Sequence, residues 1–216
     1  MAEGSEPPLM TALVVIAKEP LPGRAKTRLH PPLSLEQAAL LAAAAIDDTL
    51  LAMQPVPAAR RVLLFDGENA PALAARYEVI PQSGGDLDER LASIFDQLDG
   101  PMLLIGMDTP QVTRSDVAPV FESWPDDIDA WFGPASDGGW WALGMREPRG
   151  DLIRGVPTSR DDTGELQLAR LRSAGLRVGI LPTLTDVDTI DSAREAALVA
   201  PLGQFARTLA GFEVFA

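Results

Sequence analysis

The sequence predicts an α/β protein with a mainly parallel central sheet, and three observations carry this prediction. Short apolar runs with β-branched members recur along the chain, and amphipathic or alanine-rich segments of helical length separate most of them. Strands that alternate with helices build a parallel sheet covered on both faces. No fixed-period repeat or long linker interrupts the order. We therefore expect residues 9–216 to fold as a single domain, and residues 1–8, polar and proline-rich, to form a disordered tail.

The first unit is a strand, a loop and a helix. Residues 9–17, LMTALVVIA, are almost continuously apolar, which is typical of a central strand buried on both faces. The segment from Ser34 to Met53 begins with a Ser-x-Glu helix start and carries alanine and leucine at helical spacing. The loop between them follows the carboxyl end of the strand, where ligands bind in open α/β sheets.

The same alternation continues to the end of the chain, and residues 101–108, PMLLIGMD, are the second strongly apolar run. The further expected strands are residues 61–67, 78–82, 101–108, 127–135, 139–145 and 177–182. The further expected helices are residues 70–77, 87–98, 115–124, 164–174 and a helical tail from Thr189. Proline and glycine in residues 147–155 make that stretch the candidate lid.

Composition excludes several classes of function. The chain has 31 acidic and 18 basic residues, a net charge of −13, which argues against a nucleic-acid or anionic-membrane surface. It has no cysteine, and His30 is its one histidine, so thiolate sites, histidine-rich zinc sites and most histidine triads are excluded. Any metal should be a hard cation with oxygen ligands, Mg²⁺ or Mn²⁺. With no apolar run of about eighteen residues and no secretory signal pattern, we expect a soluble, cytoplasmic protein without a membrane span.

The loop KEPLPGRAKTR, residues 18–28, is unusually basic for an acidic protein. Its basic side chains are Lys18, Arg24, Lys26 and Arg28. Pro22 stiffens the path and Gly23 permits a tight turn, so the side chains can converge on a di- or triphosphate. A solvated loop that pairs with the protein's own carboxylates is the alternative. A Walker-A loop is disfavoured because Ala25 stands where the glycine before the lysine is required, and the G-x-G-x-x-G fingerprint is absent.

Three carboxylates follow strands and could hold a metal ion. Asp108 comes directly after the second apolar strand, where it could bind Mg²⁺ or Mn²⁺ that bridges nucleotide phosphates, or cap the following turn or helix. Asp186 and Asp188 in TDVDT lie on the same side of an extended segment. They could complete a two-carboxylate site with Asp108, or Asp188 could cap the last helical segment.

The motif GPASDGG, residues 133–139, lies between two expected strands. Gly138 and Gly139 allow the backbone to approach a ligand and Asp137 projects from the turn, although Asp-Gly is also an ordinary hairpin signal. The two tryptophans that follow alternate across a strand, so one could be in the core and the other could line a pocket. Arg160, in the polar loop before the helix at 164–174, could contact substrate or merely begin that helix.

Four motifs in this order resemble a known bacterial family: AKEPLPGRAKTRL, LLIGMDTPQ, GPASDGGWWALG and LTDVDT. The family is that of the nucleotide-diphospho-sugar transferases of glycosyltransferase-A type, which includes members linked to arsenosugar biosynthesis. The resemblance spans roughly residues 10–195. It implies a glycosyltransferase-A fold, a Rossmann-like three-layer α/β/α sandwich. Molybdenum-cofactor nucleotidyltransferases and the guanylyltransferases of deazaflavin-cofactor synthesis share this fold.

The resemblance also implies roles for individual residues. The nucleotide would be bound by Lys18, Pro22, Gly23, Arg24, Lys26 and Arg28. The metal would be bound by Asp108 and Asp188, and Asp137, with Lys26, would act in catalysis, Asp137 as a base or a positioning group. The residues themselves, rather than the resemblance, make Gly138, Gly139, Trp140 and Arg160 the expected substrate-binding residues.

Two departures from the family pattern lie toward the acceptor side. Trp140 and Trp141 stand where tyrosines are often found, and residues 156–164 replace a tryptophan-containing segment. The arsenosugar activity is therefore not carried over. We expect a Mg²⁺- or Mn²⁺-dependent transferase that binds a nucleotide or nucleotide-sugar donor and a small-molecule acceptor, and no nucleic acid. A nucleotidyltransferase that releases pyrophosphate and a non-catalytic nucleotide-binding domain are the alternatives. The base, sugar, acceptor and oligomeric state stay open.

Overall fold

A computed structural model describes residues 11–122 and 124–213 of the chain. Its centre is a seven-stranded sheet in the order β3-β2-β1-β4-β6-β5-β7. The strands are β1 (Ala12–Lys18), β2 (Arg60–Asp66), β3 (Glu78–Pro81), β4 (Met102–Gly106), β5 (Ala130–Pro134), β6 (Trp140–Met145) and β7 (Val178–Ile180). All neighbouring pairs are parallel except those of β6, which runs antiparallel to β4 and β5. The predicted α/β class with a mainly parallel sheet is confirmed.

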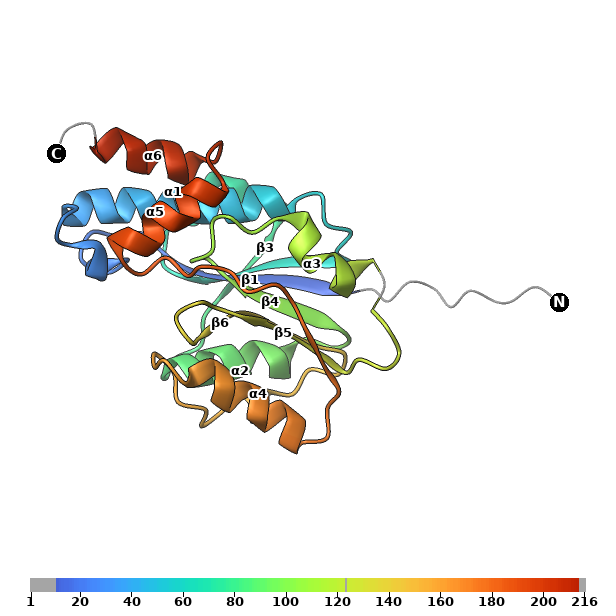
Figure 1. The fold of residues 1–216 in the computed structure, drawn as a ribbon. Helices are drawn as coiled ribbons and strands as arrows, with labels where there is room; N and C mark the ends of the chain where they lie inside the picture. Colours follow the sequence, from blue (N-terminus) through green and yellow to red (C-terminus); the bar gives the residue numbers. More distant parts are fainter. Residues whose placement is uncertain (1–10, 123, 214–216) are drawn as a thin grey trace.

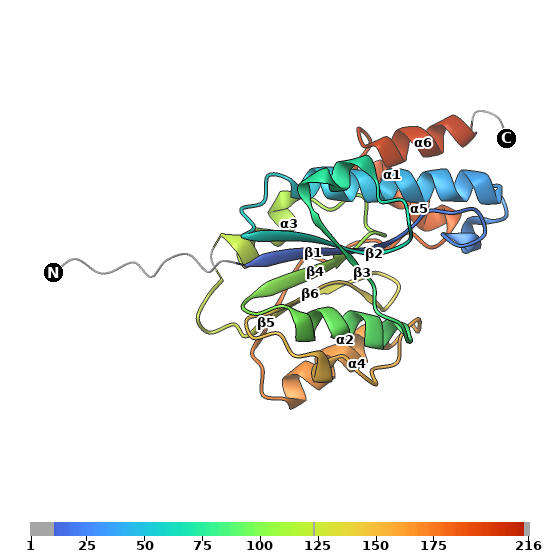
Figure 2. The same ribbon diagram turned by 180° about the vertical axis from the view of Figure 1, so that it is seen from behind.

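Helices cover both faces of the sheet, which gives three layers (Figure 1). The α-helices are α1 (Leu35–Met53), α2 (Leu87–Gln97), α3 (Arg114–Phe121), α4 (Thr163–Ser173), α5 (Ile190–Val199) and α6 (Gln204–Glu213). Helices α1, α3, α5 and α6 lie on one side of the sheet and α2 and α4 on the other, and the view from behind shows the same division (Figure 2). None of the helices in the described part of the chain is long and apolar enough to cross a membrane.

Strand β1 shows why the first apolar run becomes the centre of the sheet. Its alternate side chains enter two different clusters: Leu13 and Val15 pack on one face, Ala12 and Val14 on the other. All four are buried, because β2 and β4 pair with β1 on its two edges and helices cover both faces. The strand therefore delivers the loop at residues 18–28 to the carboxyl-terminal edge of the sheet.

A third cluster fixes the segment that follows β7. Helix α1 begins at its N-cap Ser34 with a capping box to Gln37, and it packs against α6. Val187 is 1% exposed within this cluster, beside residues of α1, α5 and α6. Burial of Val187 holds its two neighbours in sequence, Asp186 and Asp188, at the same sheet edge as the first loop.

Several expected elements differ in length or type. Residues 70–77 form a short 3-10 helix, Ala72–Arg76, and the helix expected at 115–124 is shorter. The stretch at 147–155 is attached to α2: Gly150 N donates to Asp96 and the Arg154 side chain pairs with Glu89 and Asp96. Residues 158–161 line the cleft, and the lid role of 147–155 stays a prediction. The tail expected at residues 1–8 lies outside the described residues.

Candidate functional site

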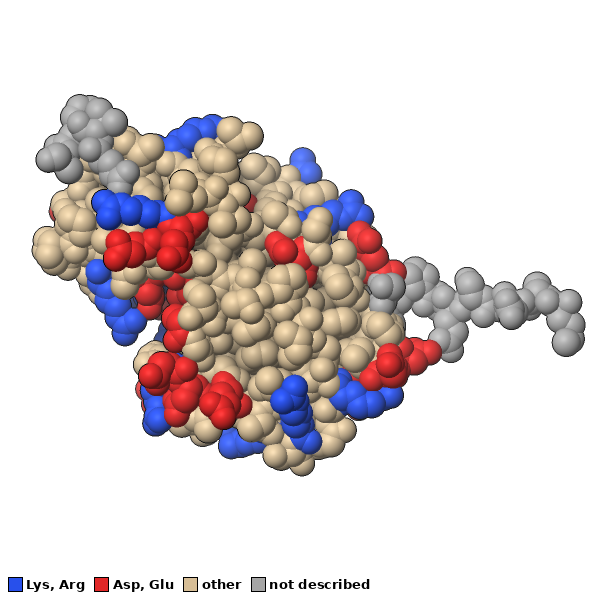
Figure 3. All heavy atoms as spheres, viewed as in Figure 1, with Lys and Arg blue, Asp and Glu red and all other residues tan. Residues whose placement is uncertain are grey.

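A cleft of about 750 Å³ opens at the carboxyl ends of the parallel strands. Figure 3 shows the molecule hollowed at the left edge of this view, where these strands end in Figure 1, with carboxylates along the hollow. The charged side chains of its lining are Lys18, Lys26, Arg28, Arg90, Asp108, Asp137, Arg160, Asp161, Asp186 and Asp188. These residues come from segments far apart in the sequence, and the fold brings most of the predicted site residues together.

Lys26 lies deepest among the basic residues of the first loop. Its backbone is left-handed, with φ 51°, and it precedes the 3-10 helix Thr27–Leu29. Buried Ala25 and Leu29 hold the loop on either side of it. Only 6% of the Lys26 side chain is exposed, so its ammonium points inward.

The ammonium of Lys26 is surrounded by oxygen atoms. Its Nζ lies 2.7 Å from Asp108 Oδ1 and 3.4 Å from Asp188 Oδ1, and it donates a hydrogen bond to the Val187 carbonyl. Burial opposes the charged form, but Asp108, Asp186 and Asp188 prevail and raise the pKa of Lys26 above its ordinary value. Lys26 is therefore a buried cation held by carboxylates.

Three carboxylates gather beside this ammonium. Asp137, Asp186 and Asp188 each offer an oxygen, and these oxygens lie within 4.8 Å of one another. Burial, with the nearby carboxylates of Asp108, Asp188 and Asp137, raises the pKa of Asp186 to about 7, although Lys26 opposes the shift. An oxygen-only donor set of this kind fits Mg²⁺ or Mn²⁺.

Backbone contacts hold the carboxylates in place. Gly139 N donates to Asp137 Oδ1 at 2.9 Å, and Val187 N donates to the Asp108 carbonyl at 2.9 Å. Arg28 Nη1 lies 2.7 Å from Asp188 Oδ2. The sequence predicted that Asp108 and Asp188 would bind the metal together. The structure instead groups Asp137 with Asp186 and Asp188. Asp108 forms an ion pair with Lys26.

Helix capping does not explain these aspartates. The N-cap of α3 is Thr113 and that of α5 is Thr189. Asp108 and Asp188 therefore do not cap these helices, and both line the cleft. Sequence reasoning considered Asp186 beside Asp188 but did not group Asp137 with them. The spacing of Asp186 and Asp188 was a usable signal, whereas the approach of Asp137 depends on the fold.

Lys18 and Arg90 add positive charge to the cleft lining, apart from the ion pairs of the carboxylate cluster. Lys18 has no ion-pair partner within residues 11–122 and 124–213, and Arg90 reaches Asp66 only at 3.9 Å. Gln82 holds Arg90 in place: its Oε1 accepts from Arg90 at 3.2 Å while its Nε2 donates to the Ala17 carbonyl at 2.8 Å. Sequence reasoning missed Gln82 and Arg90, which follow a short strand without a strong motif.

Not every predicted residue reaches the cleft. Pro22, Gly23 and Arg24 are exposed and lie outside the lining, as does Gly138. Gly23 has φ 76°, and this turn leaves Arg24 away from the lining. The basic loop therefore divides: Lys18, Lys26 and Arg28 face the cleft, whereas Arg24 does not.

Gly138 supports the site without lining it. Its φ is 89°, and a methyl group there would overlap the backbone carbonyl of Asp161. Gly164 N donates to the Gly138 carbonyl at 2.8 Å, so the two loops pack backbone to backbone. This contact places Gly139 and Arg160 in one wall of the cleft.

The two tryptophans have different surroundings. Trp141 is 1% exposed, and its Nε1 donates to the Pro182 carbonyl at 2.9 Å, so it belongs to the core. Trp140 is partly buried and lines the cleft, as does Arg160. Arg160 pairs with Asp162 at 2.7 Å.

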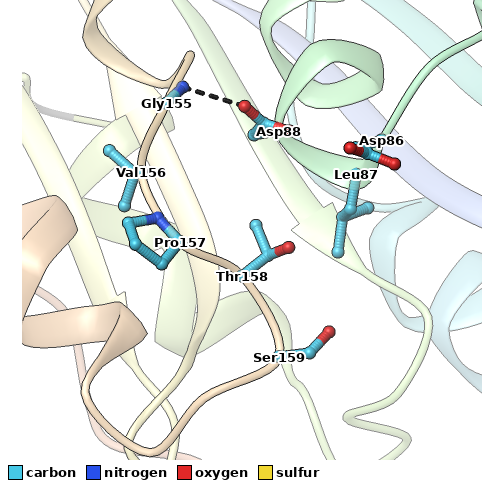
Figure 4. A pocket seen from close by; sticks show the side chains of 8 residues that line it. All are labelled: Asp86, Leu87, Asp88, Gly155, Val156, Pro157, Thr158 and Ser159. Carbon is cyan, nitrogen blue, oxygen red and sulfur yellow. Dashed lines mark hydrogen bonds between the residues drawn. The ribbon is translucent and has the colours of Figure 1, made fainter.

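A second hollow of about 410 Å³ adjoins the cleft (Figure 4). It lies between the start of α2 and the segment at 155–159, and Gly155 N donates to Asp88 across it at 2.8 Å. Leu87, Thr158 and Ser159 line both spaces. The two hollows therefore lie next to each other and share these three residues as a common border.

Comparison with solved structures agrees with this fold. The chain is similar to a crystal structure described as a "putative nucleotide-diphospho-sugar transferase" from Desulfovibrio desulfuricans G20, with a TM-score of 0.79, 26% identity, and 94% of this chain and 93% of that chain covered. This match and the fold confirm the resemblance drawn from the sequence motifs.

More distant structures share the fold alone. A CMP:2-keto-3-deoxy-manno-octonic acid synthetase complexed with CTP matches with a TM-score of 0.55 and 14% identity, over 89% of this chain and 99% of that chain. The Rv0371c protein of Mycobacterium tuberculosis in complex with manganese matches with a TM-score of 0.52 and 19% identity, over 88% and 98% of the two chains.

Sequence comparison gives the family. No protein of curated function matches the chain. The model of the DUF2064 family, whose description is "Uncharacterized protein conserved in bacteria", matches residues 38–160, more than half of the chain. The chain therefore belongs to the DUF2064 family.

Proposed function

We propose that this protein is a divalent-cation-dependent transferase that uses a nucleotide-diphospho-sugar donor. One observation carries the proposal: a carboxylate cluster and several basic side chains, among them Lys18 with no ion-pair partner in the described residues, share a single cleft at the carboxyl ends of the parallel strands. A diphosphate needs both, because its charge is neutralised by a metal ion and by lysine or arginine. The similarity to the Desulfovibrio structure supports the same assignment.

The carboxylates form the metal-binding side of the proposed site. Asp137, Asp186 and Asp188 would hold Mg²⁺ or Mn²⁺. When bound, the ion would neutralise charge that develops on the departing diphosphate. Asp137 then acts as a ligand that positions the ion rather than as a free base, which modifies the role implied by the resemblance.

The basic side chains form the phosphate side. Lys18 is exposed at the end of β1 and unpaired among the described residues, so it is free to bind a phosphate oxygen. Arg28 is 69% exposed and pairs with Asp188, so it can join the metal side to the phosphates. Arg90, held by Gln82, extends this surface toward β2 and β3.

The acceptor would enter on the opposite wall. Gly139, Trp140 and Arg160 line the cleft there. Thr158 and Ser159 line both the cleft and the second hollow, and Figure 4 shows them in the second hollow. An aromatic face beside hydroxyl and guanidinium groups suits a small polar acceptor.

Nucleotidyl transfer is the second candidate, since the same cleft could bind a nucleoside triphosphate and release pyrophosphate. Nucleotidyl transfer stays a candidate because the chain shares its fold with the CTP-bound synthetase. Incubation with nucleoside triphosphates and with nucleotide-sugars separates the two. Release of a nucleoside diphosphate from a nucleotide-sugar supports the first candidate, and release of pyrophosphate supports the second.

A non-catalytic nucleotide-binding domain is tested by ligand binding. A thermal-shift panel of nucleotides and nucleotide-sugars, with and without Mn²⁺, identifies the donor, because selective binding to the native state raises the melting temperature. For the transferase we expect a shift that needs Mn²⁺. Binding indifferent to the metal, with no turnover of any ligand in the panel, would indicate the non-catalytic domain.

A further inference from the structure

The ammonium of Lys26 already fills a cation position. Its contacts are Asp108 Oδ1 at 2.7 Å, Asp188 Oδ1 at 3.4 Å and the Val187 carbonyl, all of them oxygen atoms. The Lys26 side chain is 6% exposed, so water has little access to the ammonium and to these three contacts. A hard divalent cation prefers the same kind of donors.

Asp188 is shared between the ammonium and the carboxylate cluster. It contacts Lys26 and also belongs to the group in which Asp137, Asp186 and Asp188 place oxygens within 4.8 Å of one another. A divalent cation bound there would lie close to the Lys26 ammonium, in a partly buried region where like charges repel strongly. Both cations cannot occupy these positions with the contacts that the structure shows.

We propose that Lys26 is the resident counter-ion of the carboxylate cluster and that a divalent cation binds by displacing its ammonium. The displacement frees Asp108 to join the metal ligands and releases the ammonium toward the phosphates of the donor. The inference rests on the proposed function in that it assumes a metal site here. The proposal accounts for two residues whose contacts differ from those expected. Lys26 contacts carboxylates instead of facing open space in the cleft. Asp108 lies outside the group formed by Asp137, Asp186 and Asp188.

Local structure permits the exchange. Lys26 has a flexible four-carbon side chain on a loop bordered by exposed Arg24 and Thr27, and its own residue lines the cleft. Movement of the side chain alone would carry the ammonium from the carboxylates to the cleft. The backbone anchors Ala25 and Leu29 remain buried in either position.

The first test measures the affinity of the nucleotide-free protein for Mn²⁺. The protein is titrated with Mn²⁺, and electron paramagnetic resonance reads the concentration of free Mn²⁺. Lys26→Met removes the competing charge while keeping the length of the side chain, so Mn²⁺ should bind about tenfold more tightly than to the wild type. Arg28→Met is the matched control. Arg28 also contacts Asp188, at 2.7 Å, but it is 69% exposed and screened by solvent, so we expect a change of less than about threefold.

The second test uses the wild-type protein, so its result holds even if the variants do not fold. The chain has two lysines, Lys18, which is exposed, and Lys26, which is buried. Amine-selective labelling read by mass spectrometry should modify Lys18 at the same rate with and without Mg²⁺. Lys26 should be protected in the metal-free protein and become reactive when Mg²⁺ is added.

Four results would overturn the proposal. The first three are unchanged or weaker Mn²⁺ binding in Lys26→Met, equal tightening in Lys26→Met and Arg28→Met, and protection of Lys26 that persists with Mg²⁺ bound. Absence of Mn²⁺ binding in both the wild type and Lys26→Met would also overturn it. None of these measurements involves a nucleotide or turnover, so failure of the exchange is distinguishable from failure of the transferase assignment.

Discussion

Single residues of the first loop have different surroundings although the sequence presents them as one basic cluster. Lys18 is exposed and lines the cleft, Lys26 is buried against carboxylates, and Arg24 lies outside the lining. Hydrogen bonds from the Asn69 side chain and the Glu68 backbone lower the pKa of the Glu19 carboxyl, and the nearby charge of Arg24 lowers it further. We therefore expect position in the cleft, rather than charge alone, to decide which residue of this loop binds phosphate.

Lys18→Met should weaken binding of the donor nucleotide by about tenfold or more, because it removes a charge-assisted hydrogen bond to a phosphate oxygen. Arg24→Met is the control, since it removes the same charge from the same loop outside the cleft lining. Calorimetric titration of the nucleotide identified by the thermal-shift panel measures both. An equal loss in the two variants would mean that the loop acts only through its summed charge.

Gly138 offers a second prediction at this scale. Gly138→Ala should lower the free energy of unfolding by about 3 kcal/mol or more, because the methyl group adds steric overlap with Asp161 to the cost of a left-handed backbone. Gly175→Ala has a similar φ, 83°, but meets nothing within 4 Å, so it should lose only about 1 kcal/mol. Urea unfolding measures the difference. Equal losses would show that the two loops separate without cost.

Helices and their ends place the site at the element scale. Val187 is held at the sheet edge by the cluster that α1, α5 and α6 form together. Helix α6 is in turn held by Asp48 of α1, whose carboxylate accepts hydrogen bonds from Gln204 N at 2.9 Å and Phe205 N at 2.8 Å. A side chain of α1 therefore supports, through α6, the segment that carries two carboxylates of the site.

Asp48→Ala should lower the free energy of unfolding by about 1–2 kcal/mol and increase hydrogen exchange at the start of α6, because two backbone N–H groups lose their acceptor. Asp47→Ala is the matched control. Burial and the neighbouring Asp48 raise the pKa of Asp47, so its removal should be neutral or slightly stabilising. Exchange in α6 that responds alike to both variants would contradict this account.

Tyr77 links the 3-10 helix Ala72–Arg76 to α1, and its hydroxyl donates to the Leu50 carbonyl at 3.0 Å. Burial raises the pKa of Tyr77 to about 12, above its ordinary value near 10. Between these values the native state keeps a proton that the unfolded state has lost. The free energy of unfolding therefore falls as pH rises above about 10, by up to about 1.4 kcal/mol per pH unit from this group.

Tyr77 is the only tyrosine of the chain, so tyrosinate absorbance reports on it alone. We expect its titration in the native protein well above pH 10, and Tyr77→Phe to remove this part of the pH dependence while costing about 1 kcal/mol at neutral pH. A native titration near pH 10, or an unchanged pH dependence in the variant, would contradict the assignment.

At the scale of the whole molecule, the sequence predicted the sheet better than the site. Hydrophobic runs located β1 and β4, because strands buried on both faces need almost continuous apolar residues. The antiparallel course of β6 and the reduction of residues 70–77 to a 3-10 helix depend on tertiary contacts that no local pattern encodes.

The candidate site could be predicted in its residue types but not in its pairing. Asp108, Asp137 and Asp188 follow strands, so their gathering at one sheet edge follows from topology. Which carboxylate meets Lys26 depends on side-chain burial and on the left-handed turn at that residue, features that charge spacing does not reveal. The same limit explains why Gln82 and Arg90 were missed.

The central claim is that the carboxylate cluster and the basic side chains act on one ligand through a bound divalent cation. The most direct measurement is calorimetric titration of nucleoside diphosphates into the wild type and Asp188→Asn, with and without Mn²⁺. We predict that at least one nucleoside diphosphate binds the wild type at least about tenfold more tightly with Mn²⁺, and that this gain is lost in Asp188→Asn. Equal affinity with and without Mn²⁺, or a gain retained in Asp188→Asn, would contradict the account.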